Sequence, residues 1–300
     1  MLEGISRKDL AARSAAITTA YRGARSSAGV IASEADVLAY LVARLPATYA
    51  VAATVCEQVR DAVSDFTPRT LLDAGGGPGT ASWAARETWP ALVQTMLTDA
   101  NPYFLAMASR LGIEGTRRDL VRDALPSADL VIASFVLAEI APAAQAPLIA
   151  KLYAATTDVL VLIEPGTPPG FERIRAARAA LIGQGASVLG PCTHAAACPM
   201  TGADWCHFSQ RLPRSRDHIQ TKGASVPYED ERYSWIAVSR ARRAAFAGQA
   251  RVLAPPKDSK PGVTLKLCTP GGLENRLVAR RDREAFAALR RTSWGDVVVG

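Results

Sequence analysis

Apolar runs and amphipathic stretches alternate along the middle of the chain, and this alternation predicts its fold. The run 129–135 is almost entirely apolar, as a strand buried on both faces of a parallel sheet should be. Residues 102–111 carry apolar side chains along one side of a helix. The expected strands cover residues 70–73, 91–98, 129–135 and 158–163, and the expected helices include 102–111, 148–155 and 171–183. This order predicts an α/β open parallel sheet over residues 67–185, with helices on both faces.

The flanks of this region follow different patterns. Residues 1–66 read as helical, with an amphipathic stretch from Ser33 that we expect Pro46 to interrupt. Residues 186–230 lose the strand–helix rhythm and hold three cysteines and all three histidines, so we predict a cysteine-rich, metal-binding insertion. Residues 231–300 return to strands, and we expect them to complete the sheet domain and end in a basic segment.

Composition narrows the class of protein. The chain has 300 residues, about half of them apolar, which suits one large domain with additions. No run of about 18 uncharged apolar residues occurs, so we expect no transmembrane helix and no membrane partner. The N-terminus lacks the apolar core of a secretion signal, and its acidic residues disfavour a transit peptide. We therefore expect a monomer in the bacterial cytoplasm rather than the mitochondrial matrix, with its five cysteines reduced.

The stretch Leu71–Thr80 carries the first candidate site. Asp73 follows the end of a strand, and the spacing Gly75-x-Gly77-x-Gly79 leads into a helix. Glycine tolerates positive φ in a sharp turn and has no Cβ to hold a ligand away from the backbone. The dinucleotide fingerprint fails, because a threonine stands where its third glycine should be. The spacing resembles motif I of class I, Rossmann-like S-adenosylmethionine methyltransferases; the alternative is a glycine-rich turn in another α/β domain.

This resemblance implies roles for residues at the ends of the expected strands. The glycine loop would hold the amino-acid end of S-adenosylmethionine, with Asp73 near its ammonium group. Asp99 is placed to accept hydrogen bonds from both ribose hydroxyls. Asp119 is placed to accept from the adenine amino group, and Ser134 lies where that family lines the cofactor pocket. The catalytic residues stay unknown, because the Asn/Asp-Pro-Pro-Tyr motif of base-amine methyltransferases does not follow strand four, and a cofactor-binding fold need not be active.

Cysteines form the second candidate site. Their spacing is Cys192-x5-Cys198-x7-Cys206, with Cys268 after a long gap. Thiolates bind soft metals, and four of them hold either tetrahedral zinc or an iron–sulfur cube. The missing Cys-x2-Cys knuckle disfavours zinc, although His194 or His207 would suit a Cys3His zinc site. Cys56 lies in an apolar stripe and is expected in the core; the remaining alternative is that the other thiols are incidental.

Three segments carry a resemblance to a known family. They read Cys192-Thr-His-Ala-Ala-Ala-Cys198-Pro-Met, Trp205-Cys-His-Phe-Ser-Gln-Arg211 and Ala133-Ser-Phe-Val-Leu-Ala-Glu139. They resemble the methyltransferase-like proteins associated with the small ribosomal subunit, a family with a mitoribosome assembly factor and bacterial relatives. The resemblance implies a 4Fe-4S cluster held by Cys192, Cys198, Cys206 and Cys268. It also implies association with the small ribosomal subunit and its rRNA.

Basic residues follow the cysteines, with the aromatic residues Phe208 and Tyr228 among them. The candidate RNA contacts are Arg211, Arg214, Arg216 and Lys222. Cations interleaved with aromatic rings suit phosphate contacts and base stacking. The alternative is a solvated basic loop.

Three functions remain open at this point. The leading one is an S-adenosylmethionine-binding, iron–sulfur methyltransferase-like protein that acts on the small ribosomal subunit or its rRNA, by methylation or in assembly. The second is a non-catalytic rRNA-binding assembly factor with a structural cluster. The third is a small-molecule methyltransferase with a zinc knuckle.

Overall fold

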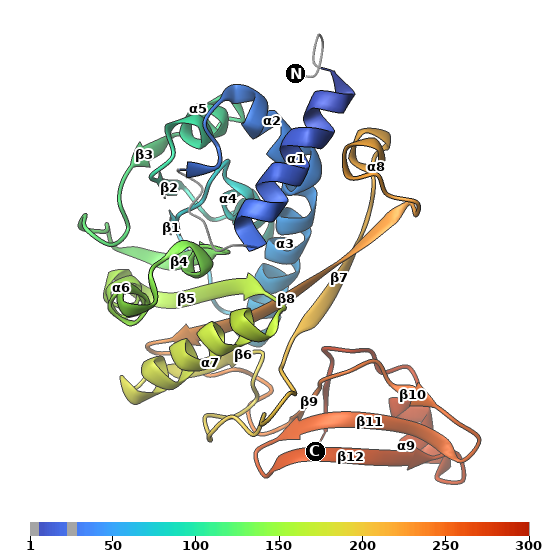
Figure 1. The fold of residues 1–300 in the computed structure, drawn as a ribbon. Coiled ribbons are helices and arrows are strands. Elements are labelled where there is room, and N and C mark those ends of the chain that lie inside the picture. Colours follow the sequence, from blue (N-terminus) through green and yellow to red (C-terminus); the bar gives the residue numbers. More distant parts are fainter. Residues whose placement is uncertain (1–5, 23–28, 300) are drawn as a thin grey trace.

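Two sheets of different size build the molecule (Figure 1). The computed structural model describes residues 6–22 and 29–299. The large sheet consists of β1 (Thr70–Ala74), β2 (Gln94–Asp99), β3 (Gly115–Arg117), β4 (Ala128–Ser134), β5 (Thr156–Pro165), β6 (Ser187–Gly190), β7 (Phe208–Pro213) and β8 (Tyr228–Ser239). The helices are α1 (Arg7–Arg22), α2 (Glu34–Ala43), α3 (Leu45–Ala62), α4 (Thr80–Thr88), α5 (Pro102–Arg110), α6 (Pro142–Ala155), α7 (Pro168–Gly183), α8 (Arg216–Lys222) and α9 (Arg283–Leu289), with a 3-10 turn at Leu137–Glu139.

The large sheet has the strand order β3-β2-β1-β4-β5-β8-β6. Strands β1 to β5 pair in parallel, whereas β8 runs antiparallel to β5 and also pairs with β6 and β7. This is the Rossmann-like arrangement of class I methyltransferases, and it confirms the predicted α/β sheet. The long antiparallel β8 makes the sheet mixed rather than purely parallel.

Helices cover both faces of the large sheet, as the alternating pattern predicts. On one face α3 and α4 pack over Leu71, Leu130 and Ile132. On the other face α6 and α7 pack over Val131 and Ala133. Successive residues of β4 thus contribute to opposite faces, which explains why this strand is apolar throughout.

The N-terminal helical region contains α1, α2 and α3, and its residues 1–5 and 23–28 lie outside the described part of the chain. Pro46 stands in the first turn of α3, and the helix breaks at Arg44, in agreement with the expected interruption. Over the described residues no single helix has the length and apolar content of a membrane span. Taken together, α2 and α3 have that length and apolar content, but the two helices are bent by 55° where they meet.

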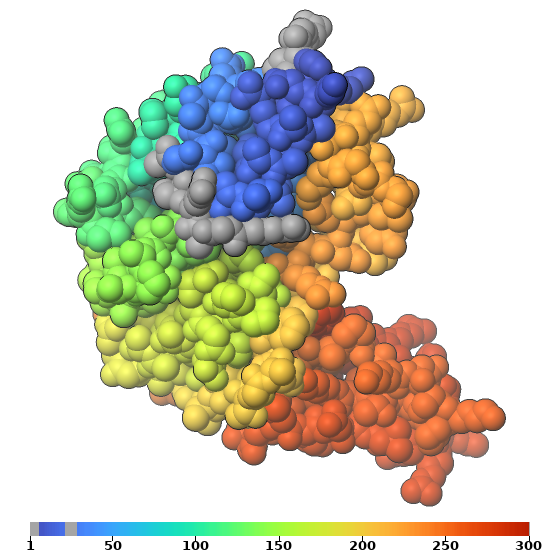
Figure 2. Space-filling view, viewed as in Figure 1, coloured from blue at the N-terminus to red at the C-terminus, as the bar shows by residue number. Residues whose placement is uncertain are grey.

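The C-terminal part of the chain differs from the prediction that residues 231–300 complete the sheet domain. Only β8 joins the large sheet; the following strands form a second sheet, covered by α9. Its strands are β9 (Ala250–Val252), β10 (Lys257–Asp258), β11 (Gly262–Thr269), β12 (Gly272–Ala279) and β13 (Val297–Val298). Likewise β6 and β7 of the predicted 186–230 insertion belong to the large sheet. Figure 2 shows the surface hollowed between α8 and this second sheet.

Candidate cofactor site and cysteine cavity

The loop between β1 and α4 lies at the carboxyl edge of the large sheet. The N–H groups of Gly75 and Gly76 donate to the Thr98 carbonyl oxygen at 2.8 and 3.1 Å, which ties the loop to β2. Gly75, Gly77 and Gly79 have φ values of 71°, 55° and 93°. Residues with a side chain rarely adopt this left-handed conformation, so the sharp entry into α4 requires glycine.

Packing adds a second reason for glycine at two of these positions. A Cβ on Gly75 would lie 2.5 Å from Cγ2 of Val136, and one on Gly79 would lie 2.9 Å from Cδ1 of Ile113. A Cβ on Gly77 would meet nothing closer than the Phe104 ring at 3.7 Å. The backbone conformation alone requires glycine at position 77. At positions 75 and 79 the surrounding side chains also leave no room for a Cβ.

Asp73 is completely buried beneath this loop. Its Oδ2 accepts hydrogen bonds from the N–H and hydroxyl groups of Ser82 at 2.9 and 2.6 Å, which holds the start of α4. Among the residues that the structure describes, none forms a hydrogen bond with its buried Oδ1. Burial raises the pKa of Asp73 to about 6, although the hydrogen bonds from Ser82 oppose this. A cationic ligand group would stabilise such a carboxylate, so the site fits an ammonium group.

Asp99 ends β2 and bonds directly to the glycine loop. Its Oδ2 accepts from the N–H of Gly77 at 2.8 Å, and its Oδ1 accepts from the N–H of Asn101 at 2.7 Å. Burial raises the pKa of Asp99, and the backbone N–H groups oppose that effect. A carboxylate oxygen can accept two hydrogen bonds. Each oxygen of Asp99 can therefore accept one more, from a pair of hydroxyls, beside its bond from the backbone.

The other two predicted cofactor residues stand at the same edge. Ser134 is the last residue of β4 and is half-buried. Asp119 is exposed two residues after β3, and its Oδ1 accepts from the N–H groups of Val121 and Arg122 at 2.9 and 3.2 Å. The structure thus brings the glycine loop, Asp73 and Asp99 together, while Asp119 hydrogen-bonds its own turn.

Asn101 organises this edge and was missed by the sequence analysis. Its side chain accepts from the N–H groups of Tyr103 and Phe104 and caps α5. It also donates to the Ile31 carbonyl oxygen at 2.9 Å, which ties the segment before α2 to the end of β2. The Tyr40 ring packs edge-on against Phe104 with 4.9 Å between centroids. The N-terminal helices therefore cover the carboxyl end of β2; an Asn-Pro pair at a helix start was the available signal.

Glu164 is the second missed residue, at the end of β5. It is completely buried, accepts from the Leu137 N–H at 3.0 Å and pairs with Arg173 at 2.6 Å. Burial raises the pKa of Glu164, and the charge of Arg173 opposes this. It fixes the turn after β4, in which Phe135 has a φ of 61°. This conformation costs a residue with a side chain about 1–3 kcal/mol, so the turn is held by its surroundings.

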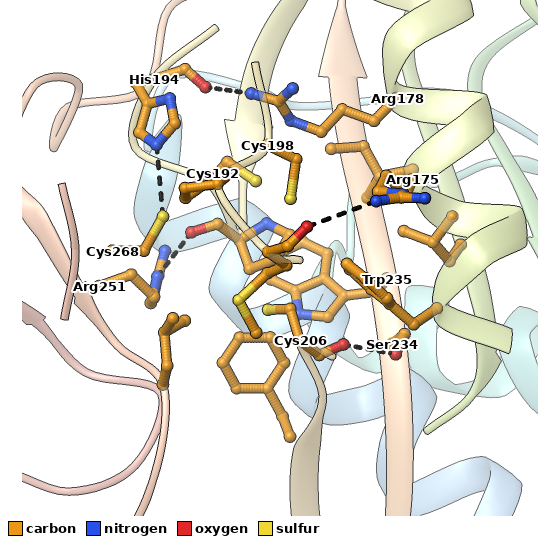
Figure 3. A pocket seen from close by; sticks show the side chains of 18 residues that line it. Arg175, Arg178, Cys192, His194, Cys198, Cys206, Ser234, Trp235, Arg251 and Cys268 are labelled. Atoms are coloured by element: carbon orange, nitrogen blue, oxygen red, sulfur yellow. Dashed lines mark hydrogen bonds between the residues drawn. The ribbon is translucent and has the colours of Figure 1, made fainter. Parts of the chain in front are cut away.

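Four of the five cysteines line one cavity between α7, β8 and the second sheet (Figure 3). The loop from β6 to β7 supplies Cys192, Cys198 and Cys206, and β11 supplies Cys268. All four are free thiols. The cavity has a volume of about 40 Å³, more than the roughly 10–15 Å³ that one water needs. Within residues 6–22 and 29–299, no three His, Cys, Asp or Glu side chains are arranged to hold a metal ion.

Two buried arginines face this cavity, and both were missed by the sequence analysis. Arg178 of α7 is 5% exposed and Arg251 of β9 is 4% exposed. Burial lowers the pKa of Arg251 to about 10, while the nearby Cys192 and Cys206 raise it. Burial raises the pKa of Cys192, while both arginines lower it. Four thiols and two buried cations therefore line the same cavity.

The two candidate histidine ligands are in different positions. His194 lines the cavity, with its Nε2 3.3 Å from the Sγ of Cys268. His207 stacks on Trp205 with 5.0 Å between ring centroids and contacts Trp294 edge-on. Cys56 is buried in the core of the large domain, as expected. If a histidine completes the thiol set, the geometry favours His194.

The predicted RNA contacts divide into two groups. Arg211 is exposed, pairs with Asp230 at 2.7 Å and lies 4.1 Å above the Tyr228 ring centroid; Arg216 is also exposed. By contrast, Arg214 and Lys222 are mostly buried and pair with Glu229, which also contacts the buried His218 at 2.9 Å. Glu229 thus holds α8 to β8. The side chains of Arg214 and Lys222 form their ion pairs within the protein, whereas those of Arg211 and Arg216 are exposed.

The fold and the glycine loop define a class I methyltransferase-like protein. The chain belongs to the family described as mitochondrial small ribosomal subunit Rsm22, whose family model matches residues 34–299. It is 28% identical over 287 residues to the human mitochondrial ribosome assembly protein METTL17, covering 87% of this chain and 62% of the human protein. It is 23% identical to the fission yeast Rsm22-cox11 tandem protein 2, covering 88% of this chain and 43% of that protein.

The chain therefore spans less than two thirds of the length of these relatives. Two solved structures are similar to part of it. One is a putative RNA methyltransferase from Pyrococcus horikoshii, with 15% identity, a TM-score of 0.42 and coverage of 64% of this chain and 84% of that one. The other is magnesium protoporphyrin IX methyltransferase from Synechocystis with bound SAM, with 14% identity, a TM-score of 0.43 and coverage of 65% and 80%.

Proposed function

We propose that this protein is an assembly factor of the small ribosomal subunit that binds S-adenosylmethionine and a 4Fe-4S cluster. The observation that carries the proposal is the family match over residues 34–299, which include both the glycine loop and the cysteine cavity. The human relative bears the name of a ribosome assembly protein. The carboxyl edge of the large sheet, with the glycine loop, Asp73 and Asp99, is the proposed cofactor site and is called the cofactor edge below. The second sheet contributes Cys268, the fourth thiol of the cavity.

The carboxyl edge of the large sheet supports the cofactor part of this proposal. The unpartnered Oδ1 of Asp73 would accept from the cofactor's ammonium group. Asp99, already bonded to Gly77, would accept from the ribose hydroxyls. The cofactor would supply an activated methyl group, while the residues named here only bind and orient it.

The turn after β4 favours assembly over methyl transfer. Its first residues, Phe135, Val136 and Leu137, are apolar, and Glu164 is engaged with Arg173 and the backbone of this turn. rRNA methylation is the alternative function, supported by the same cofactor edge. Mass spectrometry of rRNA from a deletion strain separates the two: loss of one methyl mark supports methylation, and unchanged marks with defective subunits support assembly.

The cysteine cavity supports the metal part of the proposal. Cys192, Cys198, Cys206 and Cys268 would ligate the cluster, and the apolar residues Phe171, Met200 and Leu253 pack beside them. Zinc is the alternative, with His194 replacing one thiol. Iron and sulfide analysis of anaerobically purified protein decides between them.

The exposed cations support contact with rRNA. Arg211 lies over the Tyr228 ring, and Arg216 begins α8. Cations beside aromatic rings suit phosphates and unstacked bases. We expect the protein to co-sediment with small-subunit precursors in a sucrose gradient, and Arg211→Ala with Arg216→Ala to weaken this. Migration of the wild-type protein only with free protein would contradict the proposal.

A further inference from the structure

A metal centre bound by the four cysteines would bring negative charge into the cavity that they line. Four bound thiolates carry more negative charge than the iron–sulfide core of a 4Fe-4S cluster neutralises, and one-electron reduction would add one further negative charge. Burial of uncompensated charge is costly. The residues that compensate this charge should therefore affect both how tightly a cluster is held and how readily it is reduced.

Arg178 and Arg251 are buried without an acidic partner. Among the described residues, no ion pair forms with either side chain. Their hydrogen bonds go to backbone carbonyls instead: Arg178 donates to His194 and Ala196 at 2.7 and 2.8 Å, and Arg251 donates to Pro191 and Gly295, both at 2.6 Å. Each also has a buried nitrogen without a partner, Nε of Arg178 and Nη2 of Arg251.

The two guanidinium groups come from opposite sides of the cavity. Arg178 projects from α7, next to Cys192 (Figure 3). Arg251 stands directly opposite Cys268 in the pairing of β9 with β11, so both side chains lie on the same face of the second sheet. The thiols are thus enclosed between two cations from different parts of the fold.

We propose that Arg178 and Arg251 compensate the charge of the cysteine site, stabilising the bound cluster and raising the potential at which it accepts an electron. This inference rests on the proposed cluster. Hydrogen bonds to the loop carbonyls would by themselves give the two arginines only a structural role. The proposal adds an electrostatic role, which depends on their positive charge.

The test uses the full-length protein, purified anaerobically, in the forms Arg178→Gln, Arg178→Lys, Arg251→Gln and Arg251→Lys. Glutamine keeps a hydrogen-bond donor but loses the charge, while lysine keeps the charge. Arg175→Gln is the matched control, because Arg175 lines the same cavity but is paired with Glu172 and 42% exposed. Iron content and the cluster's midpoint potential, titrated with dithionite as the one-electron donor, are the readouts.

We expect each glutamine variant to shift the redox equilibrium about tenfold toward the oxidised cluster, a decrease of about 59 mV for one electron. The lysine variants and Arg175→Gln should stay near the wild-type potential. If a glutamine variant retains no iron, retention by the matching lysine variant supports the inference. Equal potentials in wild type and glutamine variants, or equal loss of iron from glutamine and lysine variants, would overturn this inference but not the proposal that the wild-type protein binds a cluster. A wild-type protein without iron would overturn the cluster proposal and this inference together.

Discussion

At the residue scale, burial has the largest effect on the pKa of both Asp73 and Asp99, but the hydrogen bonds around the two carboxylates differ. Asp73 has one unpartnered oxygen, whereas both oxygens of Asp99 accept backbone N–H groups. The pKa of each is raised by burial, and that of Asp73 reaches about 6. Asp73 is therefore held at a cost to stability, which a cationic ligand would reduce.

This cost predicts a pH dependence of stability. Between pH of about 4 and about 6 the folded state binds the Asp73 proton more strongly than the unfolded state, so the free energy of unfolding falls as the pH rises. The two-unit shift corresponds to at most about 3 kcal/mol. Asp73→Asn, which retains an acceptor for Ser82, should remove this part of the decline. Urea unfolding across that range is the measurement.

Asp129 offers a control of opposite sign. Burial alone would raise its pKa, but hydrogen bonds from the Arg69 and Thr70 N–H groups lower the pKa below its usual value. Its contribution to stability is present above the unfolded pKa and is lost as the pH falls through the folded pKa. Asp129→Asn should therefore destabilise the protein at neutral pH. A pH profile of Asp73→Asn that matches wild type would contradict the predicted role of Asp73 burial.

Asp99 should contribute to cofactor affinity. Asp99→Ala removes the acceptor for the ribose hydroxyls and the bond to Gly77, so we expect S-adenosylmethionine binding to weaken by about 1.5–3 kcal/mol. Asp119→Ala, at an exposed carboxylate that bonds its own turn, should have a smaller effect. Isothermal titration calorimetry measures both. No binding to folded wild-type protein would contradict the cofactor proposal.

At the element scale, Glu229 fastens α8 to β8. Burial would raise its pKa, but Lys222, His218 and Arg214 lower it. Its stabilising effect is therefore present above the unfolded pKa of about 4.3 and is lost as the pH falls through the folded pKa. Glu229→Gln leaves two buried cations with one partner fewer, and we expect a loss of about 1.5–3 kcal/mol. Thermal unfolding of Glu229→Gln and wild type at pH 7 measures this; an unchanged melting temperature would contradict it.

The elements predicted from sequence are those with a continuous apolar pattern. The parallel strands β1, β4 and β5 were found because both of their faces are buried. The second sheet was not separated, since β10 and β13 have two residues each and β12 has only one buried residue, Val278. Arg251 and Cys268 are 17 residues apart in the chain, and only the pairing of β9 with β11 brings them together. Local periodicity contains no signal for such a contact.

At the scale of the whole molecule, the cysteine cavity joins the two sheets. Three thiols come from the loop of the large sheet and the fourth from β11. Because metal binding and local folding are coupled, loss of one thiolate should loosen the loop and the junction together. A bound metal centre would thus fix the position of the second sheet relative to the large sheet, next to the hollow in Figure 2.

Each of the changes Cys192→Ser, Cys198→Ser, Cys206→Ser and Cys268→Ser should abolish bound iron and the brown absorbance, and weaken RNA association. Cys56→Ser is the control, because Cys56 is buried in the core of the large domain and does not line the cavity. Iron and sulfide analysis of all five variants is the measurement. Stoichiometric zinc without iron in wild type would exclude the cluster, and unchanged iron in Cys268→Ser would place the fourth ligand elsewhere, with His194 first.

The position of Cys268 also has a consequence for the order of events during synthesis. All strands of the large sheet have been synthesised once β8 ends at Ser239, and the three loop thiols precede their fourth partner in the chain. Domains fold largely in the order in which they are made. Cys268 in β11 therefore joins the other three thiols only after the large sheet has been synthesised. A molecule whose cavity holds all four thiols has therefore been synthesised beyond β11, whereas one that stops earlier has three loop thiols without the fourth.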